Sequence, residues 1–165
     1  MVGGSLGAQV LNSTVPAALA LVTPDARPTV VHQTGAKQAD EVRAAYAQHG
    51  IAAEVLPFIT DMPARLAACD LMVCRAGAVT VSELCAAGVP ALLVPFIAST
   101  TAHQRDNAEW MASHRAAVHL PQKELTPQQL AGLLAVQTRD GLLTMAQQAR
   151  LLAQSRATAR VADEI

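Results

Sequence analysis

The chain has 165 residues, a formal net charge of −1 and a pI of about 6.5. Hydrophobic residues make up 52% of it but aromatic residues only 2%, so one sizeable core must be built largely from Ala, Leu and Val. Because the chain also has no basic run, we expect no nucleic-acid-binding surface.

Short apolar runs alternate with helical stretches along the whole chain. In chain order, the pattern predicts a helix over 7–21, a strand over 29–32, a helix over 36–49, a strand over 53–56, a helix over 61–68, a strand over 71–74, a helix over 79–87, a strand over 91–94, a helix over 102–113, a strand over 116–120, and a helical region from Thr126 that breaks near 138–141 and runs to about 153. Apolar strands separated by helices indicate a parallel sheet covered on both faces. We therefore predict one doubly wound α/β domain with a mainly parallel sheet.

Cysteines and histidines are the candidate metal ligands. Cys69, Cys74 and Cys85 lie in apolar segments without CxxC spacing, and the histidines form no HxxxH pattern. We expect reduced core thiols, no bound metal and no cofactor. No apolar run approaches the roughly 20 residues that cross a bilayer, so we expect no membrane-spanning segment.

A glycine-rich turn, Gly3-Gly4-Ser5-Leu6-Gly7, stands at the start of the first predicted helix. Glycines let the backbone approach a ligand closely, and the Ser5 hydroxyl suits a phosphate at a helix start. A purely structural turn explains the motif equally well. Such turns join a strand to a helix, and only Met1 and Val2 precede this one. We therefore expect the chain to be a fragment.

The most informative motif is Cys74-Arg75-Ala76-Gly77-Ala78-Val79-Thr80-Val81-Ser82-Glu83, where an apolar strand enters a helix through a glycine turn. The first N–H groups of a helix lack partners and attract anions, and Glu83 can accept hydrogen bonds from two neighbouring ribose hydroxyls. The alternative is an ordinary helix start, capped by Thr80 or Ser82, with Glu83 in solvent. A second glycine-rich helix start in one small domain favours a pocket for a nucleotide that carries a sugar.

Two further segments follow predicted strands. Phe58 and Ile59 could line a pocket for a flat base, and backbone N–H and C=O groups could read the edge of that base. The alternative is ordinary core contact, with Thr60 or Asp61 capping the next helix. In the polar segment 103–107, Gln104 could bond a sugar hydroxyl, and the alternative is a solvated helix face.

Other polar residues are assigned no chemistry. Arg75 is interpreted as part of a structural ion pair or as a support for the loop beside it. His32 and His49 are interpreted as structural or surface residues. No nucleophile–base–acid arrangement stands out, so no catalytic residue is assigned.

The motifs resemble those of the MurG family, the bacterial N-acetylglucosaminyltransferases of peptidoglycan synthesis. The resemblance rests on Gly3-Gly4-Ser5-Leu6-Gly7-Ala8 with Leu11-Asn12, His32-Gln33-Thr34-Gly35, Phe58-Ile59-Thr60-Asp61-Met62, the motif from Cys74 to Glu83, and His103-Gln104 with Asn107-Ala108. These motifs stand in the family's order and extend over most of the chain.

The resemblance implies the GT-B fold, in which the active site lies between two Rossmann-like domains. This chain is similar only to the C-terminal, donor-binding domain, so we expect residues 1–165 to form a single UDP-GlcNAc-binding domain without the N-terminal acceptor domain. The family implies inverting transfer of GlcNAc from UDP-GlcNAc to lipid I, which makes lipid II. The full-length protein is then expected in the cytoplasm, peripheral at the inner face of the membrane, with the general base in the other domain. The chain alone should bind UDP-GlcNAc weakly and should not catalyse.

By motif, the resemblance places Ser5 at the diphosphate, the backbone of Ile59 at uracil, Glu83 at the ribose hydroxyls and Gln104 at the GlcNAc hydroxyls. The donor would also lie against Ala78, Val79, Thr80, Val81 and Ser82, with the helix start at the phosphates and sugar. The family usually has Gln where this chain has Leu6 and Ser where it has Ala76, and each difference removes a polar group.

Two other functions stay open. One is another GT-B transferase with a different UDP- or TDP-sugar, which competition among UDP-GlcNAc, UDP-GalNAc and TDP-glucose would distinguish. The other is a non-catalytic nucleotide-sugar-binding subunit that completes its site with a partner chain, which genomic context would distinguish.

Overall fold

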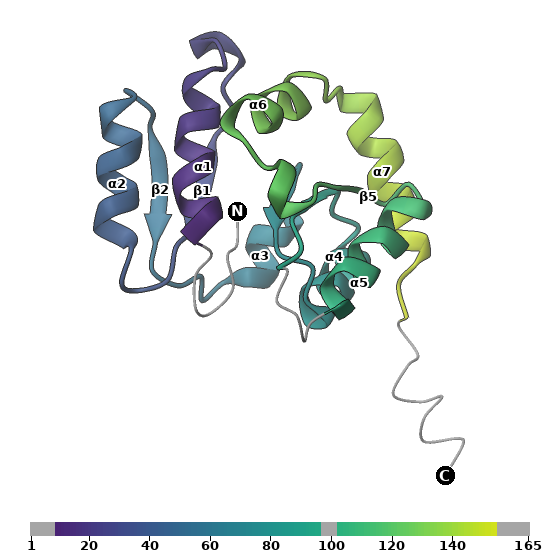
Figure 1. The fold of residues 1–165 in the computed structure, drawn as a ribbon. Coiled ribbons are helices and arrows are strands. Elements are labelled where there is room, and N and C mark those ends of the chain that lie inside the picture. Colours follow the sequence, from purple (N-terminus) through teal and green to yellow (C-terminus); the bar gives the residue numbers. More distant parts are fainter. Residues whose placement is uncertain (1–8, 97–101, 155–165) are drawn as a thin grey trace.

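The computed structural model describes residues 9–96 and 102–154, in which short strands alternate with helices (Figure 1). The elements are α1 (Gln9–Ala20), η1 (Pro24–Ala26), β1 (Val30–Gln33), α2 (Ala39–Gln48), β2 (Ala53–Leu56), α3 (Met62–Ala67), β3 (Met72–Cys74), α4 (Ala78–Ala87), β4 (Ala91–Leu93), α5 (Ala102–Ser113), β5 (Ala117–His119), η2 (Gln122–Glu124), α6 (Pro127–Ala135) and α7 (Arg139–Leu151). The two η elements are single 3₁₀ turns and were not predicted.

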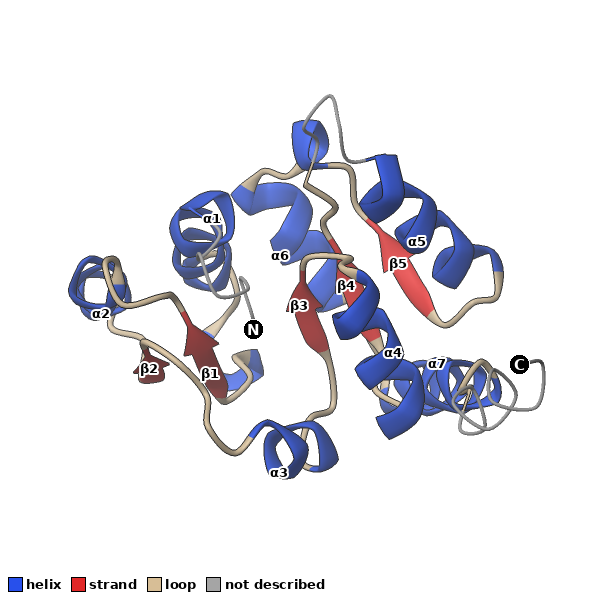
Figure 2. Ribbon diagram, turned by 90° about the horizontal axis from the view of Figure 1, so that it is seen from below, coloured by secondary structure: helices blue, strands red, loops and turns tan. Residues whose placement is uncertain are grey.

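The strands form a parallel sheet in two parts. β1 pairs with β2, and β4 lies between β3 and β5, with every pair parallel. Figure 2 shows β1 and β3 pointing the same way, but no ladder joins them within the described chain. In the common doubly wound order, the strand that precedes the first helix lies at this position. The residues before α1 lie outside the described ranges.

The two faces of the sheet support two separate cores, because successive side chains of a strand point to opposite faces. Val73 and Leu92 join a core with α1, α2 and α6. Met72 and Ala91, their neighbours in β3 and β4, join a second core with α3, α4, α5 and α7. Helices therefore cover both faces (Figure 2), and the predicted doubly wound α/β fold is confirmed.

Most of the predicted elements are confirmed, with ends that differ by at most three residues where the structure describes them. Local chemistry explains the ends. Gly88 closes α4 in the left-handed conformation at φ 70°. Thr126 and Thr138 cap α6 and α7, each accepting a backbone N–H at 3.1 Å. The Thr138 cap accounts for the predicted break in the C-terminal helical region.

Candidate functional site

The turn between β3 and α4 presents an open helix N-terminus. Gly77 is the N-cap, with φ −64° and ψ 150°, and no side chain caps it. Within the described ranges, no hydrogen bond is made by the backbone N–H groups of residues 78–80. The alternative, a helix start capped by Thr80 or Ser82, is not observed, since no side chain caps α4 and the Ser82 hydroxyl donates to the C=O of Ala78 at 2.9 Å. This helix start can therefore receive an anion.

Two side chains of α5 hold the loops beside this helix start. Asn107 Nδ2 donates to the C=O of Ala76 at 3.0 Å and so fixes the turn that precedes α4. Gln104 Oε1 accepts the N–H of Phe96 at 2.9 Å. This bond orients the Gln104 amide, and its NH₂ group can donate to a ligand.

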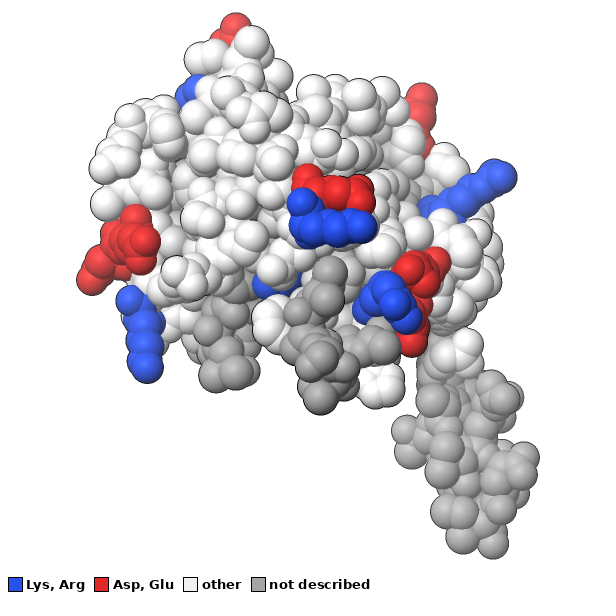
Figure 3. Space-filling view, viewed as in Figure 1, with Lys and Arg blue, Asp and Glu red and all other residues white. Residues whose placement is uncertain are grey.

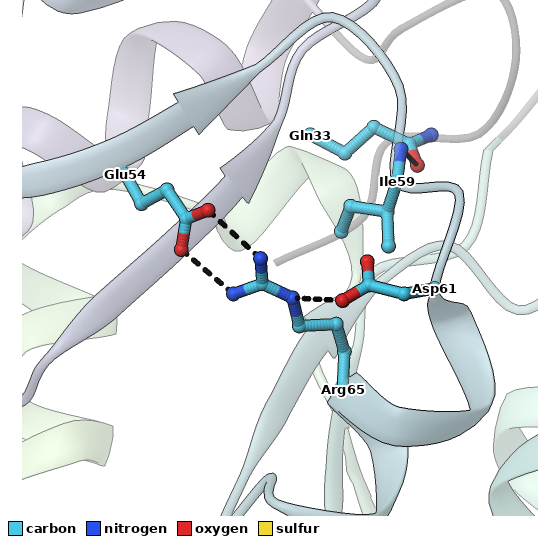
Figure 4. A network of polar contacts seen from close by, with 5 residues as sticks. All are labelled: Gln33, Glu54, Ile59, Asp61 and Arg65. Atoms are coloured by element: carbon cyan, nitrogen blue, oxygen red, sulfur yellow. Dashed lines mark hydrogen bonds and ion pairs between the residues drawn. The ribbon is translucent and has the colours of Figure 1, made fainter.

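The loop after β2 combines a buried residue with an exposed ring. Ile59 is 4% exposed, and its N–H donates to Gln33 Oε1 at 3.1 Å. Figure 4 shows the Gln33 amide reaching the backbone of Ile59 from the end of β1. Phe58 is 62% exposed, so its ring is open to a flat ligand. The Ile59 side chain belongs to the interior, and only its backbone can serve a ligand.

Ion pairs of Arg65 with Glu54 and Asp61 hold the same loop in place. Arg65 donates two hydrogen bonds to Glu54, at 2.7 and 2.8 Å, and one to Asp61 at 3.0 Å (Figure 4). The Arg65 hydrogen bonds lower the pKa of the Glu54 carboxyl. The alternative, a cap by the Thr60 or Asp61 side chain, is not observed: Asp61 occupies the N-cap position of α3, but its carboxylate accepts from Arg65 and no side chain caps the helix.

Glu83 lines a shallow hollow beside the open helix start. The hollow has a volume of about 450 Å³ and is lined by Ala78, Val79, Ser82, Glu83 and Ala86. Glu83 follows Thr80 by three positions, which is about 4.5 Å along the helix axis. One ligand can therefore meet both the helix N-terminus and this carboxylate. Val81, in contrast, is 7% exposed and packs into the core.

A larger groove of about 650 Å³ is lined by residues of α1 and α2 and by residues that follow β3, β4 and β5. Asn12 and Gln38 lie on one side, and Arg75, Phe96 and Gln122 complete the lining. None of the described site residues that were predicted lines this groove. Sequence reasoning missed Gln38 and Gln122, for which no local pattern gave a signal.

Arg75 supports the loops of this groove. Its Nη1 donates to the C=O of Val94 at 3.0 Å and to Gln122 Oε1 at 2.8 Å. The guanidinium lies 5.3 Å from the centroid of the Phe96 ring. The predicted support of a loop is confirmed, whereas the predicted ion pair is wrong because both hydrogen-bond partners are neutral.

The three cysteines are unpaired thiols whose burial disfavours the thiolate form. All three are free, and burial raises the pKa of Cys74 to about 12 and also raises that of Cys69 and Cys85. In the part of the chain that the structure describes, no group of His, Cys, Asp or Glu side chains could hold a metal ion. No described helix is long and apolar enough to cross a bilayer. The predicted site residue Ser5 lies outside the described ranges.

Charged side chains are sparse on the face shown in Figure 3. Acidic and basic groups form small separate clusters, some of them with both signs, between large uncharged areas. An anion that binds on this face would therefore depend on backbone N–H groups more than on a broad basic surface.

Comparison with protein families identifies the domain. The model described as the glycosyltransferase family 28 C-terminal domain matches residues 1–164. The chain belongs to this family. The family 28 match extends over both parts of the sheet and includes every residue of the candidate site.

Two relatives carry the name UDP-N-acetylglucosamine--N-acetylmuramyl-(pentapeptide) pyrophosphoryl-undecaprenol N-acetylglucosamine transferase. The protein from Methylibium petroleiphilum is 64% identical over 100% of this chain, and the one from Chromobacterium violaceum is 61% identical over 99%. The chain spans about half the length of these relatives, since it covers 46% of each.

Solved structures agree with the fold. The crystal structure of Acinetobacter baumannii MurG matches 99% of this family 28 domain with a TM-score of 0.91 and 40% identity, over 48% of its own length. The glycosyltransferase VinC in complex with dTDP matches with a TM-score of 0.64 at 22% identity and covers 41% of its own length, which shows the fold alone.

Proposed function

We propose that this domain binds the UDP-GlcNAc donor of an inverting glycosyltransferase that transfers GlcNAc to lipid I and forms lipid II. The observation that carries the proposal is the open N-terminus of α4 at residues 78–80, with Glu83 on the same helix. The names of relatives at 64% and 61% identity support this donor and this acceptor.

The helix start would bind the diphosphate of the donor. When the bond to the sugar breaks, negative charge grows on the departing UDP, and unpaired N–H groups that are already oriented stabilise it. Asn107 holds the turn at Ala76, so these groups need little reorganisation. Ser5 is proposed as a further diphosphate contact on the evidence of its motif alone.

The remaining parts of the donor have candidate contacts on neighbouring loops. Glu83 would accept hydrogen bonds from the ribose hydroxyls, and the loop at Phe58 and Ile59 would hold uracil. The NH₂ group of Gln104 would donate to a hydroxyl of GlcNAc. These loops follow β2, β3 and β4, and ligands of doubly wound folds bind beyond the carboxyl ends of the strands.

We also propose that the domain is the donor-binding half of a larger enzyme. The 46% coverage of its relatives supports this proposal. The other half would hold the lipid I site and the general base. Peripheral association with the inner face of the membrane, and the absence of nucleic acid from its partners, belong to the same proposal.

Titration with UDP-GlcNAc tests the donor assignment. Amide NMR shifts should change at Ile59, at Gln104 and from Ala78 to Glu83, and UDP-GalNAc and TDP-glucose should compete less well than UDP-GlcNAc. Tighter binding of TDP-glucose would favour the alternative transferase. Shifts confined to other parts of the chain would refute the site.

A further inference from the structure

We propose that the groove beside Arg75 binds the peptide of the acceptor, with the guanidinium on its terminal carboxylate and the side-chain amides of Gln38 and Gln122 on its carbonyl oxygens. The inference rests on the proposed function, in which lipid I is the acceptor. The acceptor in the names of the relatives is an N-acetylmuramyl-(pentapeptide) pyrophosphoryl-undecaprenol. Its sugar and lipid would stay with the other half of the enzyme, and its peptide would reach this domain.

The amide of Gln38 is oriented by the buried side chain of Asn12. Asn12 Nδ2 donates to the C=O of Thr34 at 3.1 Å, so the atom of Gln38 that lies 2.6 Å from the same nitrogen must be the oxygen Oε1. Gln38 lines the groove, and within the described chain its NH₂ group makes no hydrogen bond. The groove therefore receives a fixed donor from the start of α2.

Arg75 orients a second amide in the same way. Its Nη1 can only donate, so the atom of Gln122 that lies 2.8 Å from it is Oε1, and the NH₂ group of Gln122 is left to donate. The same Nη1 also donates to the C=O of Val94. No hydrogen bond to a described residue is made by Nε or Nη2 of Arg75. These two nitrogens form one edge of the guanidinium, which matches the two oxygens of a carboxylate.

The charges around the groove fit a single carboxylate better than a diphosphate. Arg75 is half-buried, and it forms no ion pair with any described Asp or Glu. Since a charge held away from water is costly without a counter-charge, an incoming anion stabilises it. Among the described residues that line the groove, the other charged one is Glu41 on α2. The lining thus has no net charge, which disfavours a ligand with several negative charges.

The groove is also within reach of the proposed donor site. Arg75 precedes Ala78 by three positions, which is at most about 11 Å of chain. The open N–H groups of residues 78–80 would hold the donor diphosphate, so an acceptor that meets the donor there can lay its peptide along the groove. The volume of about 650 Å³ is ordinary for a ligand site. The two oriented NH₂ groups suit the neutral carbonyl oxygens of a peptide.

The test compares N-acetylmuramyl-pentapeptide, without diphosphate or lipid, with the same compound ending in a carboxamide. Both are titrated by calorimetry into the full chain of wild type, Arg75→Gln and Glu41→Gln. We expect wild type to bind the acid about tenfold more tightly than the amide, and Arg75→Gln to bind the two equally. Glu41→Gln is the matched control in the same groove. It should keep the preference and bind the acid at least as tightly as wild type, because it loses a charge that repels the carboxylate.

The ratio of acid to amide separates a contact from a structural effect. Arg75 also supports the loops beside it, and damage to these loops would weaken binding of both compounds alike. A preference that persists in Arg75→Gln overturns the inference, and so does a wild-type chain that binds both compounds equally or binds neither. If Arg75→Gln does not fold, Arg75→Lys removes the two-point edge and must lower the preference.

Two further titrations identify the source of the anion and keep the two proposals apart. If wild type shows no preference and Arg75→Gln loses affinity for inorganic pyrophosphate, the groove serves a diphosphate and the inference is overturned. Binding of UDP-GlcNAc without binding of the muramyl-pentapeptide overturns the inference and leaves the donor assignment standing. A wild-type chain that does not bind UDP-GlcNAc refutes the proposed function and, with it, the inference that rests on it.

Discussion

Nδ1 of His32 lies 2.9 Å from the hydroxyl oxygen of Tyr46, and the two side chains are 0% and 1% exposed. On the other edge of the ring, Nε2 lies 3.0 Å from Asn12 Oδ1. Since Asn12 Nδ2 donates to the C=O of Thr34 at 3.1 Å, the Asn12 oxygen must face His32. Nε2 therefore carries the proton and Nδ1 accepts from Tyr46. This neutral histidine joins α1, β1 and α2.

Acid should destabilise the protein through His32. Burial lowers the pKa of His32 to about 3, while the unfolded chain has the ordinary value of 6.5. Between these values the unfolded state binds the extra proton, so the stability that neutral His32 contributes is complete above about pH 6.5 and is lost as the pH falls towards 3. The residue should contribute a slope of at most about 1.4 kcal/mol per pH unit.

Urea denaturation across this pH range measures the effect. Carboxylates also titrate at the acid end, so the informative quantity is the difference between wild type and His32→Gln, which cannot take up the proton. The variant should lose less stability per pH unit than wild type. Parallel curves would show that His32 is protonated equally in the folded and unfolded states.

Removing the hydroxyl of Tyr46 should destabilise the fold. Tyr46→Phe keeps the ring in the core but leaves Nδ1 of His32 buried without a donor, which costs about 1–3 kcal/mol. The free energy of unfolding in urea measures this loss. In the background of His32→Gln the same substitution should cost a different amount, because the two side chains are in contact. Additive costs would contradict the hydrogen bond.

The order of the elements could be predicted from the sequence because each strand is short, largely apolar and bounded by helix signals. The pattern of 71–74 and 91–94 already required a sheet buried on both faces, and alternate residues such as Met72 and Val73 do enter different cores. The division of the sheet into two parts could not be predicted, since pairing between strands is decided by tertiary contacts and not by local periodicity.

The helix start at α4 could be predicted because its signal is local. The role of Ser82 could not, since its hydroxyl can accept from a backbone N–H as a cap or donate to a carbonyl one turn back, and the sequence does not distinguish the two. Side-chain contacts between residues far apart in the sequence were also missed, because no local pattern indicates them. Gln122 meets Arg75 from 47 positions away, and Gln33 meets Ile59 from 26 positions away.

Glu83→Ala tests the ribose contact. The substitution should weaken UDP binding by about 1–3 kcal/mol, the loss expected for hydrogen bonds to a charged acceptor. Binding of pyrophosphate, which has no ribose, should not change. Asp25→Ala is the matched control, because Asp25 lies in η1, which precedes β1 and is far along the chain from the loops that follow the strands. Equal UDP affinity in Glu83→Ala and wild type would exclude the ribose role.

Gly77→Ala tests whether the ligand comes close to the backbone at the start of α4. Among the described residues other than its two chain neighbours, a methyl group at Gly77 would meet no atom nearer than Thr80 Oγ1 at 3.9 Å, and the φ of −64° suits any residue. The free energy of unfolding should therefore change by less than about 1 kcal/mol. The methyl group would nevertheless stand beside the open N–H groups, so we expect the affinity for UDP-GlcNAc to fall about tenfold or more.

Gly88→Ala, at the other end of the same helix, should show the opposite behaviour. Gly88 has φ 70°, and an added Cβ would lie 3.4 Å from the C=O oxygen of Ala146 and from Cβ of Arg150 on α7. Stability should fall by about 1–2 kcal/mol, while the folded protein binds UDP-GlcNAc as wild type does. Thermal unfolding and calorimetric titration of both variants measure the two quantities. If Gly77→Ala binds UDP-GlcNAc normally, the donor does not approach the backbone at this helix start.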